Sequence, residues 1–228
     1  MPTTLTTFRS WLRLDLNDPA GASQRLADGD LDRAVERAVV EYSRAYPWLR
    51  DHVLATVAGS RDVSLAALAA LWHVEEVEWP TGQYPPALVD WRVSPDRQTL
   101  TLLVPAAPGG EQARVRWASK HTVDAGTSTL PEEHEALVAL GAGGFACLAY
   151  SMPSADNFRY EDGATAALVD DTAIPLEWRR RADALLTEFR HQLALLAASR
   201  VLGGRNRAVW SQPRPAPRWP LDAPGREP

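Results

Sequence analysis

Apolar residues recur at helical spacing in two segments near the start of the chain. The first segment predicts a short helix that ends in the breaker cluster of residues 17–21, with an apolar face formed by Leu5, Phe8, Trp11 and Leu12. The second segment begins at Asp28 or Asp30 and is stopped by Pro47. Its apolar positions follow a period close to 3.6 residues and are Leu31, Ala34, Val35, Ala38, Val39 and Tyr42. Two amphipathic helices are therefore expected before residue 48.

Between residues 52 and 123 the pattern changes to short β-prone runs. These runs are residues 52–58, 73–79, 87–93, 99–104 and 113–117, and Gly, Pro, Ser and Asp separate them. In the last run, Val115 and Trp117 alternate with arginines, as expected of a strand with one buried face. The spacing predicts a small antiparallel sheet or sandwich. The Ala- and Leu-rich stretch 64–71 predicts one or two helical turns.

Helical spacing returns after residue 128. Thr129 and Glu132 have the spacing of a capping box, with Pro131 in the first turn, and predict a helix that runs to about Tyr150. A loop is predicted at residues 154–165. The segment 175–202 then predicts a long helix with one apolar stripe, which at ~1.5 Å per residue would measure about 40 Å.

The order of these elements predicts an α+β protein. Residues 1–51 and 126–202 are expected to form one helical bundle, because the helices on either side of the β region have incomplete apolar faces alone. Residues 52–125 are the predicted β-rich insertion, a small antiparallel unit that projects from the bundle. Residues 203–228 are predicted to be an extended C-terminal arm.

The predicted arm has the composition of a docking segment. Prolines at positions 213, 215, 217 and 220 prevent it from continuing the helix before it. Large aromatic residues on an extended basic segment are typical anchors in protein recognition. Fully extended at ~3.1 Å per residue, it would reach about 80 Å, enough to contact a neighbouring subunit. The predicted partner-binding residues are Arg205, Arg207, Trp210, Arg214, Arg218 and Trp219.

Charge is unevenly distributed along the 228 residues. The net charge is −5, whereas five arginines against one Asp and one Glu give residues 203–228 a charge of +3, which leaves −8 for the rest. An acidic body is a poor general binder of nucleic acid. The chain start lacks the basic and apolar stretches of a signal peptide, and no apolar run approaches the ~20 residues that span a bilayer. A soluble protein made and used in a cytoplasm, with no membrane contact, is expected.

Candidate chemical motifs are incomplete. His134 and Glu135 begin a zinc-protease helix motif, but Val138 stands where its second histidine would be. The glycine run 141–144 lies inside a predicted helix, so close helix packing or a kink is expected there rather than a phosphate loop. The single cysteine, Cys147, excludes an internal disulfide and is expected to be a buried core residue.

The other groups of polar residues are not expected to form a metal site or a catalytic site. His73, Glu75 and Glu76 are expected to form a solvent-facing strand edge rather than a metal site, which needs three or four ligands. His121 and Asp124 could be half of a catalytic pair, but no activated nucleophile accompanies them. The acidic residues of 156–171 lack calcium-loop spacing. No catalytic residue, cofactor or metal site is therefore predicted, and the protein is not expected to be an enzyme.

Several segments together resemble the head–tail adaptor (connector) proteins of tailed bacteriophages and prophages. The resemblance is carried by the short helix of residues 5–12, by DGDLDRAVERAVVEYSRAYP at 28–47 and by TLPEEHEALVALGAGGFACLAY at 129–150. The run VEEVEWPTGQYPP at 74–86 is similar to adaptors that carry a small sheet between their helices. The match covers about two thirds of the chain and is one of pattern and order.

The resemblance implies a structural protein of the virion neck, assembled in the host cytoplasm. It would form a ring of about twelve copies between the portal and the tail, around the DNA channel. Its partners would be the portal protein, a tail or gatekeeper protein and other copies of itself, with transient non-specific contact with passing DNA. The last helix and the arm would dock on the portal or on a neighbouring subunit, and the acidic body would suit a channel that repels DNA.

Three alternatives remain open from the residues alone. One is a gatekeeper or tail-completion protein one layer lower in the same neck. Another, from a different class, is an unrecognised small hydrolase or metal enzyme. The third is a bacterial scaffolding or regulatory module that uses the arm as a peptide ligand.

Overall fold

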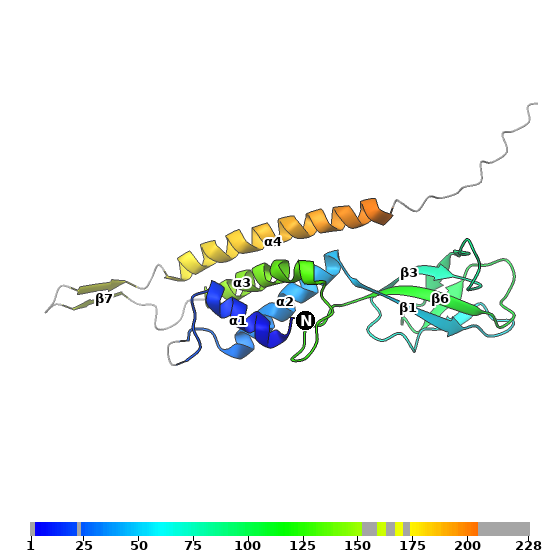
Figure 1. The fold of residues 1–228 in the computed structure, drawn as a ribbon, viewed down its shortest axis with the longest axis horizontal. Helices are drawn as coiled ribbons and strands as arrows, with labels where there is room; N and C mark the ends of the chain where they lie inside the picture. Colours follow the sequence, from blue (N-terminus) through cyan, green and yellow to red (C-terminus); the bar gives the residue numbers. More distant parts are fainter. Residues whose placement is uncertain (1–2, 22–23, 152–158, 163–166, 171–173, 205–228) are drawn as a thin grey trace, which may run out of the picture.

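Four helices form one lobe of the protein, and the strands between residues 48 and 119 form another (Figure 1). The computed structural model describes residues 3–21, 24–151, 159–162, 167–170 and 174–204. Four helices lie together: α1 (Leu5–Asp15), α2 (Asp28–Ala45), α3 (Glu135–Tyr150) and α4 (Ile174–Gly204). The strands between α2 and α3 project as a separate lobe (Figure 1). The predicted α+β class is confirmed.

The first two helices have clear local signals at their ends. The Thr4 side chain accepts a hydrogen bond from the backbone N–H of Thr7 and caps α1. In α2 the Asp30 carboxylate accepts from the backbone N–H of Ala27 at 3.2 Å. This is one half of a capping box, because an alanine side chain cannot accept the reciprocal bond. The predicted starts and apolar faces of both helices are confirmed.

The predicted capping box at Thr129 is wrong. The 3₁₀ turn η1 (Glu132–His134) precedes α3, and Pro131 occupies its N-cap position. The Thr129 hydroxyl oxygen instead accepts from the backbone N–H of Thr122, at 2.9 Å. The side chain therefore closes the loop 122–129 and starts no helix.

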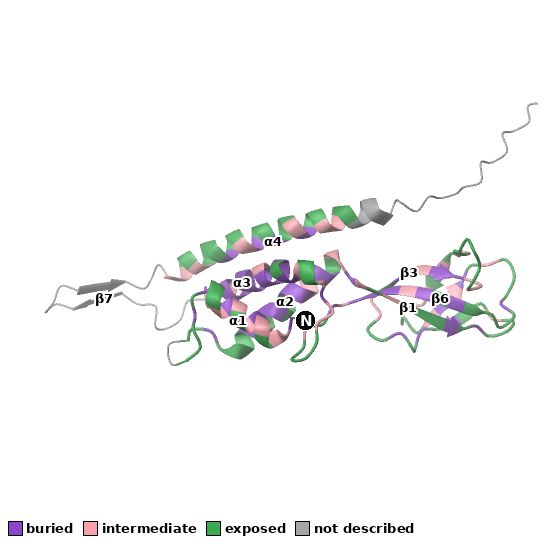
Figure 2. Ribbon diagram, viewed as in Figure 1, coloured by how far each residue is buried: buried purple, intermediate pink, exposed green. Residues whose placement is uncertain are grey.

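One hydrophobic core joins all four helices. α4 lies along α3, and α1 and α2 pack on the other sides of α3 (Figure 1). Figure 2 shows the buried positions following the inner faces of these helices. The largest fully buried side chains of this core are Phe8, Leu12, Leu16, Leu31, Val35, Tyr42 and Phe189.

The glycine run of α3 allows α4 to approach closely. A Cβ at Gly141 would lie 2.8 Å from the ring of Phe189, and one at Gly144 would lie 2.8 Å from Cγ of Leu186. Real Cβ contacts are essentially never this short, so only glycine fits at these positions. The predicted close helix packing is confirmed.

The strand lobe is a sandwich of two three-stranded antiparallel sheets. One sheet has the order β1-β6-β3 and the other has the order β2-β5-β4. The strands are β1 (Trp48–Ala55), β2 (Asp62–Ser64), β3 (His73–Glu78), β4 (Trp91–Val93), β5 (Thr99–Leu102) and β6 (Gln112–Ser119). Their inner faces form a second core, which includes Leu54, Val63, Val77, Leu100, Leu102, Val115 and Trp117. The two cores have no residue in common.

Several predicted boundaries in this region are wrong. β1 begins at Trp48 rather than at residue 52, because all eight of its residues pair with β6. The stretch 64–71 contains β2's last residue followed by turns, and no helix. The predicted loop 154–165 contains the strand β7 (Arg159–Asp162), which pairs with β8 (Ala167–Asp170). The predicted start of the arm at residue 203 is also wrong, because α4 continues to Gly204. Residues 205–228 of the predicted arm lie outside the described residues.

Candidate interaction surfaces

The predicted partner-binding residues cannot be placed on a surface. Arg205, Arg207, Trp210, Arg214, Arg218 and Trp219 all lie outside the described residues. The described chain reaches Gly204, the last residue of α4. The surfaces available for docking are therefore those of the two lobes.

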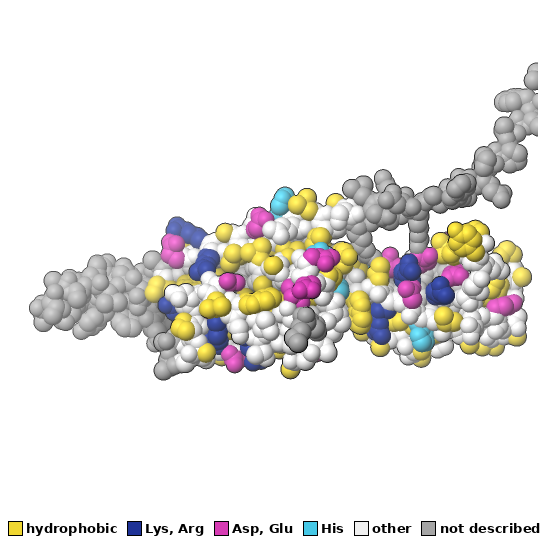
Figure 3. All heavy atoms as spheres, in the orientation of Figure 1, with side chains coloured by type: hydrophobic (Ala, Val, Ile, Leu, Met, Phe, Trp, Pro, Cys, Tyr) yellow, Lys and Arg dark blue, Asp and Glu magenta, His cyan; other side chains and the backbone are white. Residues whose placement is uncertain are grey.

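An apolar groove runs between α1 and α3. Its cavity volume is about 390 Å³, and it is lined by Trp11, Leu14, Asp15, Ala136, Ala139 and Leu140. Leu14 is 78% exposed although it is a large aliphatic side chain. Figure 3 shows hydrophobic side chains gathered on the side of the molecule where α1 and α3 lie. Exposed apolar side chains beside an open groove are typical of a protein–protein contact.

The helical spacing of α1 explains why this groove stays open. Phe8 and Leu12 face the core and are fully buried. Leu14 is two residues beyond Leu12, which rotates it about 200° away from the core. Trp11 lies between these two directions and contacts Phe8 edge to face, with the ring centroids 5.4 Å apart. The helix thus presents one apolar face inward and a second apolar edge to solvent.

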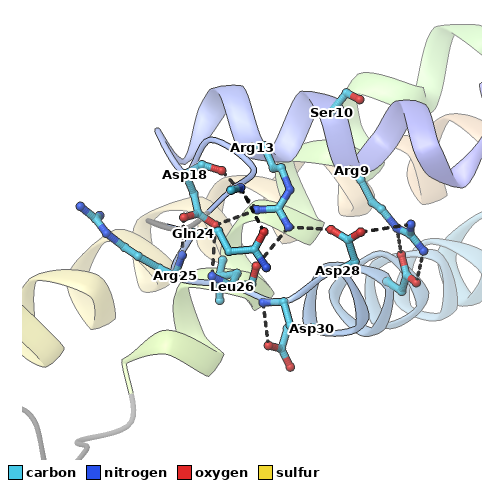
Figure 4. Close-up of polar contacts among 12 residues, drawn as sticks. Arg9, Ser10, Arg13, Asp18, Gln24, Arg25, Leu26, Asp28 and Asp30 are labelled. Carbon is cyan, nitrogen blue, oxygen red and sulfur yellow. Dashed lines mark hydrogen bonds and ion pairs between the residues drawn. The ribbon is translucent and has the colours of Figure 1, made fainter.

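A polar network holds the groove wall α1 in place (Figure 4). The Arg13 guanidinium contacts the carboxylates of Asp18 at 3.1 Å and of Asp28 at 2.6 Å. Arg9 forms two hydrogen bonds of 2.5 Å to Asp32. The hydrogen bond from Arg13 lowers the pKa of the Asp28 carboxyl. These contacts join α1 to α2 and to the loop between them.

Asp18 is the buried centre of that network. Its carboxylate accepts hydrogen bonds from the backbone N–H groups of Arg25, at 2.6 Å, and Leu26, at 3.1 Å (Figure 4). With Arg13 on the same carboxylate, the charge is both paired and hydrogen-bonded, as a buried charge must be. The sequence showed only a breaker cluster at this position.

Aromatic and histidine side chains fill the junction between the two lobes. The Tyr42 hydroxyl lies 2.7 Å from Nδ1 of His134. The buried ring of His121 lies 5.3 Å from that of Tyr42 and stacks on Trp48 at 6.5 Å. Burial raises the pKa of Tyr42 and lowers that of His121. Both shifts favour the neutral forms of the Tyr42 and His121 side chains in this packed junction.

The predicted half of a catalytic pair does not form. His121 Nδ1 donates to the backbone carbonyl oxygen of Thr129, at 2.8 Å, because a carbonyl oxygen can only accept. Its Nε2 is buried and has no hydrogen-bond partner among the residues that the structure describes. Asp124 instead uses its backbone N–H to close a turn with Thr127. The hydrogen bond to Thr129 therefore holds the imidazole ring of His121 within the junction between the two lobes.

His73 is exposed and Cys147 is buried, as the sequence predicted. His73 Nε2 and Glu75 Oε1 are 2.9 Å apart, and His73 is exposed on β3. Cys147 is buried, and its burial raises the pKa of the thiol to about 11, so the thiol is neutral at pH 7. Among the described residues, no group of three or more His, Cys, Asp or Glu side chains could hold a metal ion. Within that same part of the chain, no helix is long and apolar enough to cross a membrane.

The comparisons with known proteins yield structural matches only. No family model and no curated protein matches the sequence. The chain is similar to a solved structure described as the neck of an empty GTA particle computed with C6 symmetry. The match has 19% identity and a TM-score of 0.27, over 78% of this chain and 89% of that one.

A second match is to the virion of a native gene transfer agent (GTA) particle. It has 21% identity and a TM-score of 0.28, over 78% of this chain and 89% of that one.

The sequence pattern missed the groove for an identifiable reason. Leu14 was not assigned to any face, because it falls outside the stripe of Leu5, Phe8 and Leu12. A large apolar residue that directly follows an amphipathic stripe but lies outside it, as Leu14 does, is a signal of an exposed apolar surface. The partner wall, formed by Ala136, Ala139 and Leu140 of α3, required the tertiary structure.

Proposed function

We propose that this protein is a structural head–tail adaptor of a tailed-phage-type particle. In this role it forms a ring between the portal and the tail, around the DNA channel, and it belongs to the virion neck. About twelve copies packed side by side would close such a ring. The protein acts by binding other subunits and catalyses no reaction.

The observation that supports this proposal best is the arrangement of the segments that resemble adaptors. Residues 28–47 and 129–150 are far apart in the sequence, yet they contain α2 and α3, which pack in one core with α1. The segment 74–86 belongs to the lobe that projects from this core. The order and the packing are those expected of an adaptor that carries a sheet between its helices.

The groove between α1 and α3 gives the ring one of its contact surfaces. A closed ring of identical copies is built from two different surfaces on each subunit, one contacting the next copy and one the previous copy. The groove, with Leu14 at its rim, supplies the concave surface. Burying exposed side chains such as Leu14 would contribute about 25 cal/mol per Å² of apolar area.

Charge supports the placement around DNA. The chain outside residues 203–228 carries a charge of −8, so its surface repels phosphate at the distances of a channel wall. The basic arm, with Arg205, Arg207, Trp210, Arg214, Arg218 and Trp219, is assigned to the contact with the portal or with a neighbouring subunit. In this proposal the acidic body surrounds the DNA, and the basic arm binds the portal or a neighbouring subunit.

The test is assembly with the portal protein encoded in the same genome. Full-length protein and a form ending at Leu202 are mixed with the portal and imaged by electron microscopy. A ring stacked on the portal only with the full-length chain supports both the adaptor function and the role of the arm. A ring with both forms supports the adaptor function alone. No ring with either form contradicts it and favours a lower layer such as a gatekeeper.

A matched pair of variants tests the groove. Leu14→Glu places a charge at the groove rim and is expected to weaken ring formation at least 10-fold. Thr6→Glu adds the same charge to an exposed position of α1 that does not line the groove, and it should assemble normally. Equal assembly of the two variants would remove the groove from the proposed interface.

A further inference from the structure

The strand β1 has one free edge. It forms the outer strand of the sheet β1-β6-β3, and all eight of its residues, from Trp48 to Ala55, pair with β6. Within the described part of the chain, no second strand pairs with β1. Such an edge presents unpaired backbone N–H and C=O groups and is a template for a further strand.

The two faces along this edge differ in chemistry. On the outer face, Leu49 and Val53 are 42% and 41% exposed, and the Asp51 carboxylate between them is paired with Arg116 of β6 at 2.9 Å. On the opposite face, the Arg50 guanidinium lies 4.8 Å from the ring centroid of Trp48 and 5.0 Å from that of Trp117. One face therefore offers apolar surface beside an ion pair, and the other offers an aromatic and cationic stack.

Residues 205–212 of the arm fit such an edge. This segment, RNRAVWSQ, contains eight residues without proline, the same length as β1, and Pro213 ends it. In an extended strand Arg205 and Arg207 share one face, and Trp210 lies on the other. Val209 shares the face of the two arginines and would lie beside the exposed Leu49 and Val53. Trp210 would lie on the face where Arg50 stacks on indole rings.

The position of α4 makes a second copy the occupant. α4 ends at Gly204, on the side of the molecule nearer β3, whereas β1 lies at the opposite edge of the sheet (Figure 1). Arg205 follows Gly204 directly, so no linker is left to carry the segment around its own sheet. A neighbouring copy in a ring can present its β1 edge without this constraint.

We propose that residues 205–212 of one copy add as a strand to the free edge of β1 in the next copy. The contact is head to tail, as a closed ring requires, and strand addition supplies backbone hydrogen bonds without a preformed pocket. This inference rests on the proposed function for the ring itself. The proline-rich remainder of the arm stays available for the portal.

Cysteine cross-linking between chains tests the contact directly. In a Cys147→Ala background, one full-length chain carries Val53→Cys and a second carries Val209→Cys. The two are mixed under mild oxidation, and a disulfide-linked heterodimer is expected. A control chain with Leu103→Cys, exposed elsewhere on the strand lobe, should give at least 10-fold less heterodimer. Equal yields, or no heterodimer with Val53→Cys, would overturn the inference.

A second test breaks the added strand without touching the folded lobes. Val209→Pro removes a backbone donor inside the eight-residue segment, whereas Ala216→Pro adds a proline where prolines already alternate. Only Val209→Pro should lower self-association, by at least 10-fold, as measured by sedimentation velocity. Unchanged association of Val209→Pro contradicts strand addition.

Two further outcomes separate this inference from others. One outcome is that a chain with both Val53→Cys and Val209→Cys forms a disulfide within itself, whereas the mixed single-cysteine chains stay unlinked. This result would show that the arm binds the sheet of its own chain, and it would overturn the proposal. Rings on the portal formed equally well by Val209→Pro would leave the adaptor function standing and reject the strand contact.

Discussion

Gly141 of α3 lies directly against the ring of Phe189 of α4. A Cβ at Gly141 would stand 2.8 Å from Cε1 and Cζ of that fully buried ring. Because neither the ring nor the two helix backbones can move aside cheaply, the pair fixes the distance between α3 and α4. The position of α4, and of its last residue Gly204, depends on this contact.

Gly141→Ala should therefore destabilise the protein. The overpacking is expected to lower the free energy of unfolding by about 1–3 kcal/mol, despite the higher helix propensity of alanine. Gly29→Ala is the control, because a Cβ at this position in α2 meets nothing within 4 Å. It should leave stability unchanged or raise it by up to about 1 kcal/mol. Urea denaturation followed by circular dichroism measures both, and a neutral Gly141→Ala would show that the helices can separate freely.

The buried Asp18 carboxylate should be among the most sensitive polar groups of the helical lobe. Asp18→Asn removes the charge that pairs with Arg13 and replaces one acceptor oxygen with a donor facing backbone N–H groups. The expected loss of unfolding free energy is about 2–4 kcal/mol. Asp28→Asn, at an exposed contact of the same arginine, should cost much less, because solvent screens this ion pair. Similar losses for both variants in thermal denaturation would be inconsistent with this structure.

Acidification should destabilise the junction between the lobes through His121. Burial lowers the pKa of His121 in the folded protein, so below about pH 6.5 the unfolded chain binds more protons than the folded one. The free energy of unfolding is therefore expected to fall as the pH drops from 7.5 to 5.5.

The variant His121→Phe separates this effect from general acid sensitivity. It retains an aromatic ring beside Tyr42 and Trp48 but cannot be protonated, so its stability at pH 7.5 is lower and its loss between pH 7.5 and 5.5 is smaller. Urea titrations at several pH values measure the slope. A variant slope as steep as that of the unmodified protein would assign the pH dependence to other groups.

The thiol of Cys147 should report on opening of the helical core. Burial raises its pKa to about 11, so little thiolate is present at pH 8 and reagents cannot reach it in the folded state. Reaction with a chromogenic disulfide is expected to be at least 100-fold slower in the native protein than in 6 M guanidinium chloride. Rapid native labelling would mean that α3 detaches from the core.

The local sequence by itself determined the helices, because helical burial repeats within a few residues. The stripes of α1 and α2, the ends near residues 28 and 47, and the role of the glycines 141–144 all follow from short-range spacing and side-chain size. The α+β class and the division into helical segments and a strand region follow from the same spacing.

The tertiary structure alone decided the pairings between distant residues. The Thr129 hydroxyl oxygen accepts a hydrogen bond from the backbone N–H of Thr122 rather than capping a helix. β1 begins at Trp48 because all eight of its residues pair with β6. The groove at Leu14 and the free edge of β1 exist only because of where α3 and β6 lie. Such features depend on which segments meet in space, and a pattern with a period of two or 3.6 residues carries no information about that choice.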